Sequence, residues 1–225
     1  MPTDVKSYRV FVSVPGGMEA ERRAVREATV AFSESQGLAK GAMFVTVGGE
    51  VTPGGVALPQ ALTNELVRES DFFMLLLHDR WRMRGEQDAA GGRASDPEEE
   101  FELATECLDR ADSPMRQIAV LFRAVAPEQE REAKFHLKQV LDFKRNLPGQ
   151  ANVLSETFND LSGLRDGVRS VLATWVRGLE PERGTRPGVK PRVAAEQKTG
   201  YPLALDESGV APAIARAELL EEAKR

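Results

Sequence analysis

Cysteine and histidine are scarce in this sequence of 225 residues. Cys107 is its one cysteine, and its two histidines, His78 and His136, show no metal-ligand spacing. A single cysteine excludes both a disulfide framework and a cysteine-based zinc cluster, and it fits a protein that works in a reducing compartment. We therefore expect no bound metal ion.

Long apolar runs and an excess of positive charge are also missing. The longest apolar run, residues 72–77, is far too short to cross a bilayer, and residues 1–7 lack the basic-then-apolar pattern of a signal peptide. The 30 Lys and Arg residues are interspersed with 35 Asp and Glu residues, so no basic face for a nucleic-acid backbone is predicted. We expect a cytoplasmic protein without a membrane partner or a direct nucleic-acid partner.

The motifs of most familiar α/β proteins are absent as well. The segment SVPGGME at residues 13–19 supplies neither the G-x-G-x-x-G of a dinucleotide site nor the acidic pair of a phospho-receiver domain, and its one serine is too little for the phosphate loop of a flavodoxin. No G-x-x-x-x-G-K-[ST] phosphate loop and no G-x-S-x-G nucleophile elbow occurs in the chain. The common nucleotide-binding and hydrolase uses of an α/β fold are thereby excluded.

What the chain does contain is a regular alternation of apolar runs and amphipathic stretches. Apolar runs predict five strands, at residues 8–14, 42–47, 71–77, 117–122 and 153–158. Apolar residues at helical spacing predict five helices, at residues 18–35, 60–70, 97–108, 127–146 and 161–179. This order predicts one α/β domain over residues 1–179, with a five-stranded, doubly wound parallel sheet of the flavodoxin-like order 2-1-3-4-5.

The composition changes after residue 179. Five prolines punctuate a segment with few large apolar residues: Pro181, Pro187, Pro191, Pro202 and Pro212. Proline lacks the N–H donor that strand pairing requires, so residues 180–225 are predicted to be a linker or arm outside the sheet. We expect a helix at 212–224 only when the arm docks, and we expect the arm to connect the domain to a partner or a sensor region.

An acidic helix carries the strongest chemical signal. In SDPEEEFELATECL, residues 95–108, either Ser95 or Asp96 caps the helix, and three glutamates occupy the first turn, where the helix dipole favours negative charge. Capping together with a solvated acidic face is one interpretation of this run. The other gives a chemical role to Glu100, which directly precedes the apolar Phe101 and so lies at the boundary between the core and the carboxyl edge of the sheet.

Three segments, in order along residues 10–122, resemble a known family. VFVSVPGGMEAERRAVREA looks like the F-[IV]-S-S-x-x-x-D-[LV]-x-x-E-R-x-A-V opening of a prokaryotic family of TIR-like domains. LPQALTNELVRESDFFMLLLHDRW is similar to that family's central block, and SDPEEEFELA resembles its S-G-T-x-x-E-[FY]-x-x-A helix. Members of this family often stand at the N-termini of NTPase sensor proteins.

The resemblance implies that Glu100 is a catalytic carboxylate. The family is similar to TIR domains and to nucleoside deoxyribosyltransferases, in which the glutamate of G-T-x-x-E-[LI]-G-x-A is the nucleophile at the anomeric carbon of the sugar. Aligned by that spacing, Glu100 takes the position of the glutamate and Ala104 that of the last alanine. Glu102 is the rival if the letters ELA are matched instead.

Two loops at the carboxyl edge supply candidate substrate-binding residues. Ser13, Gly16 and Gly17 offer backbone N–H groups near a helix N-terminus, which suits a phosphate or ribose, although a tight strand-to-helix turn also explains them. Arg80 either holds a phosphate or orients Glu100, or it forms a surface ion pair. Trp81 either stacks on a base or covers the core.

The sequence thus favours a TIR-like effector or signalling domain that hydrolyses an N-glycosidic bond, in prokaryotic defence or signalling. NAD is the expected substrate, without a further cofactor. The alternative is a non-catalytic interaction module of a larger sensor assembly. The expected partners are a nucleotide-type small molecule and either a second copy of the chain or a sensor protein reached through the C-terminal arm.

Overall fold

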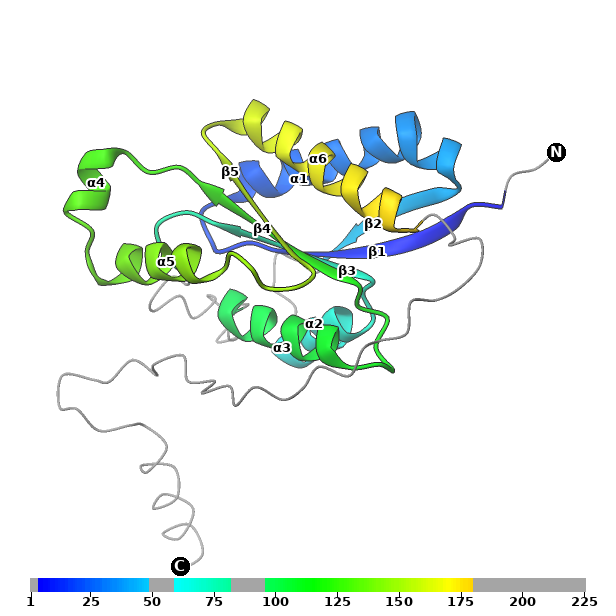
Figure 1. Ribbon diagram of the computed structural model, residues 1–225, viewed down its shortest axis with the longest axis horizontal. Helices are drawn as coiled ribbons and strands as arrows, with labels where there is room; N and C mark the ends of the chain where they lie inside the picture. Colours follow the sequence, from blue (N-terminus) through cyan, green and yellow to red (C-terminus); the bar gives the residue numbers. More distant parts are fainter. Residues whose placement is uncertain (1–3, 49–58, 82–95, 180–225) are drawn as a thin grey trace, which may run out of the picture. The chain divides into compact units, whose positions relative to one another are not determined.

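The computed structural model describes residues 4–48, 59–81 and 96–179 (Figure 1). The chain divides into two units, Met1–Pro181 and Glu182–Arg225, and every described residue belongs to the first. The predicted arm at 180–225 and its helix at 212–224 lie outside the described residues. Within the described ranges, no helix combines the length and the apolar character needed to cross a membrane.

Five parallel strands form one sheet in the order β2-β1-β3-β4-β5. The strands are β1 (Lys6–Ser13), β2 (Ala42–Val47), β3 (Phe72–Leu77), β4 (Gln117–Arg123) and β5 (Val153–Phe158). The order reverses direction after β2-β1, as in a flavodoxin-like sheet. The predicted α/β fold with its five-stranded, doubly wound parallel sheet is confirmed.

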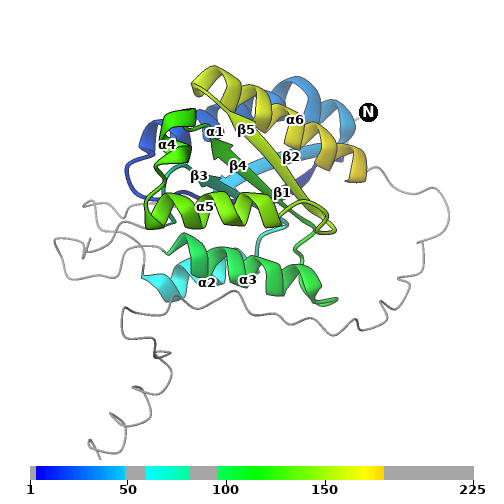
Figure 2. The same cartoon turned by 60° about the vertical axis from the view of Figure 1, so that its left-hand side comes forward.

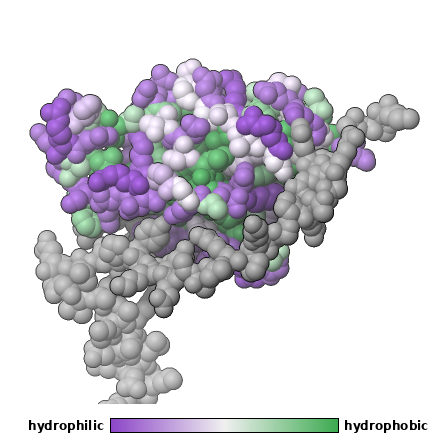
Figure 3. Space-filling view, viewed as in Figure 1, coloured by the Kyte–Doolittle hydropathy of each residue, from purple (hydrophilic) through white to green (hydrophobic). Residues whose placement is uncertain are grey.

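Helices cover both faces of this sheet (Figures 1 and 2). One face carries α1 (Glu19–Phe32) and α6 (Leu161–Leu179), and the other carries α2 (Gln60–Arg68), α3 (Pro97–Asp109) and α5 (Phe135–Asn146). Because both faces are covered, every residue of the central strand β3 is buried. Polar residues dominate the outer surface in Figure 3, and apolar residues show mainly at the middle of that view, between the two helical layers.

Alternate residues of each strand enter opposite cores, as the pleat of a strand requires. On β1, Val10 and Val12 pack on the side of α1 and α6, whereas Phe11 packs on the side of α2, α3 and α5 and stacks on Phe73 of β3 at 5.6 Å. Ser13 lies two residues after Phe11 on β1, so the two side chains share one face of the sheet. The Ser13 side chain is therefore directed to the face that α3 covers.

The helix predicted at residues 127–146 is two helices, α4 (Pro127–Arg131) and α5 (Phe135–Asn146). None of the residues of α4 is buried, whereas α5 buries Val140 and Phe143 against the sheet. Packing against the sheet therefore orients α5 but not α4. The helix predicted at residues 18–35 likewise ends earlier, at Phe32, and a π-helical turn (Ser33–Gly37) and a 3-10 turn (Leu38–Lys40) lead on to β2.

Candidate functional site

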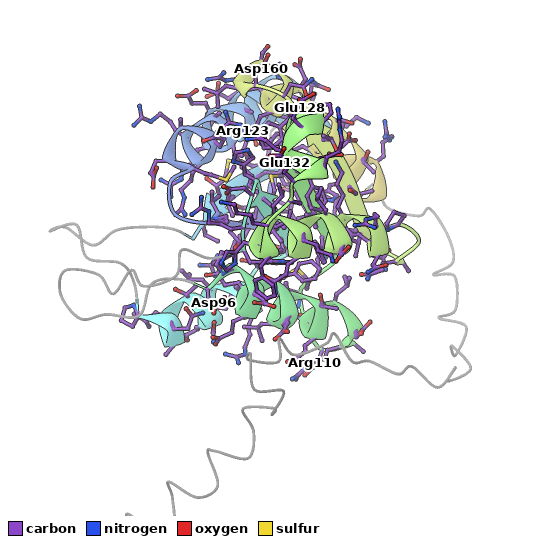
Figure 4. All side chains as sticks on the ribbon, turned by 90° about the vertical axis from the view of Figure 1, so that its left-hand side faces the viewer. Asp96, Arg110, Arg123, Glu128, Glu132 and Asp160 are labelled. Carbon is purple, nitrogen blue, oxygen red and sulfur yellow. The ribbon has the colours of Figure 1, made fainter. Side chains whose placement is uncertain are left out.

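The acidic helix α3 begins at the carboxyl edge of the sheet and presents one carboxylate to the interior. Asp96 caps it by accepting a hydrogen bond from the backbone N–H of Glu98 at 3.2 Å, and Figure 4 shows Asp96 at one end of α3 and Arg110 at the other. The buried residues of α3 lie three or four apart, on one helical face: Pro97, Glu100, Phe101, Ala104 and Cys107. Glu100 belongs to this face and has 0% of its surface exposed.

Ser13 meets Glu100 across the space between the sheet and α3. The Ser13 hydroxyl donates a hydrogen bond to Oε2 of Glu100 at 2.5 Å, and Ser13 itself is only 1% exposed. The structure thus brings together two of the residues proposed from sequence, one from the last position of β1 and one from the first turn of α3.

Arg22 is a third member of this site, and sequence reasoning did not single it out. Its Nη2 donates to the carbonyl oxygen of Val14, the residue after Ser13, at 2.9 Å. Burial lowers the pKa of Arg22, and the attraction of the Glu100 carboxylate is the largest effect opposing that shift. The signal was present in the sequence, because Arg22 is the arginine of ERRAV, which matches the E-R-x-A-V of the family pattern.

Gly16 and Gly17 form the exposed turn between β1 and α1. Gly17 has a φ of +85°, a conformation that glycine adopts without strain, and its N–H donates to Oε1 of Glu19 at 3.0 Å. Hydrogen bonds from the backbone N–H groups of Glu19 and Gly17 lower the pKa of the Glu19 carboxyl. A substrate phosphate at the Gly17 N–H would therefore have to replace this carboxylate.

The loop after β3 carries Arg80 and Trp81. The guanidinium of Arg80 forms a two-bond fork with Asp79, at 2.9 and 2.8 Å, and this bonding lowers the pKa of Asp79. Both side chains are about two-fifths exposed, at 42% and 41%. Trp81 lies against Phe101 and Phe143, with ring centroids 6.1 and 4.6 Å apart, and so contributes to the core beneath α3.

Two other glutamates of α3, Glu99 and Glu102, have different surroundings. Oε1 of Glu99 accepts a hydrogen bond from Asn64 of α2 at 3.0 Å, and Glu102, the rival candidate, is exposed. Partial burial and the nearby acidic side chains, Glu98 first among them, raise the pKa of Glu102. In the described part of the chain, no group of three or more His, Cys, Asp or Glu side chains is placed to hold a metal ion.

Replacing Glu102 by Gln is expected to raise the thermal midpoint modestly near neutral pH. A raised pKa means that the charged form is less favourable in the folded chain than in the unfolded one, so stability falls as the pH rises through this range. The gain should disappear at about pH 3, below the ordinary pKa of glutamate, where the carboxyl is protonated in both states. Thermal unfolding of both chains at the two pH values measures this, and an equal difference at both would contradict it.

Comparisons with known proteins add little to this description. No protein-family model matches the chain, and no curated protein matches it. Among solved structures, the chain is similar to an NAD(P)H:quinone oxidoreductase from Methanothermobacter marburgensis, with 15% identity over 80% of this chain and 100% of that one, and a TM-score of 0.37. A likeness this weak carries no argument, so the fold assignment follows from the strand order.

Proposed function

We propose that this chain hydrolyses an N-glycosidic bond and that Glu100 is its catalytic carboxylate. The observation that carries the proposal is the hydrogen bond from the Ser13 hydroxyl to Glu100, which holds a carboxylate at the carboxyl edge of the parallel sheet. Ligands of doubly wound sheets bind at this edge. A carboxylate withdrawn from water interacts strongly with positive charge that develops next to it.

Cleavage of an N-glycosidic bond develops such a charge. As the bond between the anomeric carbon and the base nitrogen breaks, its electron pair leaves with the base, and the sugar becomes oxocarbenium-like. The Glu100 carboxylate stabilises that cation through space or by transient bond formation at the anomeric carbon. A water molecule then supplies the new oxygen at this carbon and releases one proton.

NAD is the substrate that best suits a site with a single buried carboxylate. Its nicotinamide carries a formal positive charge on the ring nitrogen, so it takes up the electron pair of the broken bond and leaves as a neutral molecule. No general acid has to protonate the leaving group, in contrast to most glycoside hydrolyses, which need two carboxyl groups. The products are ADP-ribose, nicotinamide and one proton.

The loops after β1 and β3 supply the other residues of the proposed site. Ser13 orients Glu100, and Gly16 and Gly17 line the turn beside it, while Arg80 and Trp81 follow the neighbouring strand β3. These five residues are the proposed substrate contacts. The resemblance to TIR-like domains supports a cytoplasmic effector or signalling role, in which the chain associates with itself or with a sensor protein through its C-terminal arm.

A second candidate function is a non-catalytic interaction module. The observation that favours it is the complete burial of Glu100, because a carboxylate with 0% exposure has no surface for a substrate to touch in this conformation. In that role, the Ser13–Glu100 bond would only fasten α3 to β1. The two functions differ in whether the chain consumes NAD.

Incubating the full chain with NAD is expected to release nicotinamide and ADP-ribose in equal amounts, as measured by chromatography. The assay should cover a range of protein concentrations, since TIR-type domains are often silent as monomers. The chain denatured by heat is the control for spontaneous hydrolysis. Failure to release nicotinamide at any concentration, including conditions that drive self-association, would favour the interaction module.

A further inference from the structure

The sheet has two edge strands, β2 and β5, whose outer backbone groups have no neighbouring strand within the described structure (Figure 1). On β5, the exposed residues Ser155, Glu156 and Thr157 are polar, and the charge of Glu156 opposes pairing with another strand. β2 has no such protection in its own sequence. Its six residues, AMFVTV, contain no charge and no proline, and they combine apolar character with a high preference for strands.

Two side chains of β2 add an apolar surface to this edge. Ala42 and Phe44 enter the core beneath α1 and α6, so Met43 and Val45 point to the other face of the sheet. Met43 is 38% exposed and Val45 is 40% exposed. The helices described on that face, α2, α3 and α5, therefore leave these two side chains largely uncovered.

The side chain of Ser33 takes the place of a neighbouring strand at the centre of β2. The carbonyl oxygen of Gly41 accepts the N–H of Lys6 from β1 at 2.8 Å, so alternate residues of β2 turn towards β1, and the N–H and C=O of Phe44 turn outwards. The Phe44 N–H donates to Oγ of Ser33 at 3.0 Å, and the same hydroxyl donates to the Phe44 carbonyl oxygen at 3.3 Å. One hydroxyl thus satisfies both groups that an added strand would use.

The π-helical turn Ser33–Gly37 holds this hydroxyl against the strand. It directly follows Phe32, the buried last residue of α1, and Ser33 itself is only 5% exposed. Gly37 lies so close to β2 that a Cβ atom there would be 2.5 Å from the carbonyl oxygen of Ala42, an approach that glycine permits. The turn therefore covers two outward-facing residues of β2, Ala42 and Phe44.

We propose that the turn Ser33–Gly37 is a strap that prevents β2 from pairing with β2 of a second copy of this chain. The strand is complementary to itself in the antiparallel direction. With Phe44 at the twofold axis, Met43 of one copy lies opposite Val45 of the other, so the two apolar side chains meet on the uncovered face. No charged side chain within the strand opposes this pairing. The inference does not depend on the proposed glycosidic cleavage.

Ser33→Ala in the full chain is expected to release the edge. At low protein concentration, the Phe44 amide should exchange with solvent deuterium at least about tenfold faster than in the unmodified chain, because its acceptor is gone. At higher concentration, the average mass should roughly double relative to the unmodified chain, and the same amide should regain protection as strand pairs form. Hydrogen exchange followed by NMR and sedimentation equilibrium measure the two effects.

Two further variants locate the effect. Ser35→Ala is the matched control, because Ser35 belongs to the same turn but its hydroxyl donates to the Ala31 carbonyl of α1, at 2.6 Å. It should keep the mass and the exchange rate of the unmodified chain. Adding Val45→Lys to Ser33→Ala should restore the original mass and leave the Phe44 amide in fast exchange, since a lysine on an edge strand opposes pairing.

The result that supports the strap is association of Ser33→Ala that Val45→Lys reverses, together with fast exchange at Phe44. An unchanged mass of Ser33→Ala at every concentration would overturn the inference, and so would unchanged exchange of the Phe44 amide. Association that persists after Val45→Lys would overturn it as well, because the contact would then lie away from β2 or come from an unfolded chain.

Discussion

Replacing Glu100 by Gln is expected to reduce NAD cleavage about a thousandfold or more, because the substitution removes the charge that stabilises the oxocarbenium-like transition state. Gln has nearly the same shape as Glu, and its amide oxygen still accepts the hydrogen bond that Ser13 donates at 2.5 Å. The loss should therefore fall on kcat, with the fold intact. Far-ultraviolet circular dichroism and initial rates of nicotinamide release measure the two effects.

Glu102→Gln is the matched control for this experiment. It makes the same chemical change on the same helix, two residues further along, at a side chain that is exposed. Its NAD cleavage should stay within about twofold of the unmodified chain, as is usual for a surface position away from a site. Equal losses in both variants would show that the overall charge of α3 matters, rather than Glu100 itself. Full activity of Glu100→Gln would show that Glu100 is not catalytic.

The sheet could be predicted from sequence because its signal is local. Continuous apolar runs such as residues 72–77 indicate strands covered on both faces, and their alternation with amphipathic stretches indicates parallel crossovers. The break between α4 and α5 was not predicted, because apolar residues at helical spacing continue across it. Only the packing of α5, through Val140 and Phe143, distinguishes the two helices.

The candidate site was predictable in part. Glu100 came from a resemblance that matched its spacing from the helix start, and the pleat of β1 then explains why Ser13 reaches it. The contact of Arg22 was not predictable from spacing, because its partner is a backbone carbonyl, that of Val14 in the loop after β1. For Gly17, the sequence could not reveal that Glu19 accepts its N–H.

The core beneath α1 and α6 has Trp175 as one of its largest buried side chains. Trp175 is 1% exposed and stacks on Phe72 of β3, with ring centroids 4.4 Å apart at an angle of 19°. It also lies 6.3 Å from Phe44 of β2, so it joins α6 to two strands. In the described structure, its indole Nε1 is buried without a hydrogen-bond partner, an arrangement that costs free energy.

Trp175→Ala is therefore expected to lower the free energy of unfolding by about 3–5 kcal/mol, from lost burial and the cavity that remains. This corresponds to a fall in the thermal midpoint of roughly 10 °C.

Trp175→Phe should cost less than about 2 kcal/mol, because it keeps a ring against Phe72 and removes the unpaired N–H donor. Leu161→Ala, at a residue of the same helix that is 36% exposed, is the control and should cost less than about 1 kcal/mol. Denaturant unfolding of the four chains measures these differences, and a Trp175→Phe variant as unstable as Trp175→Ala would contradict this account.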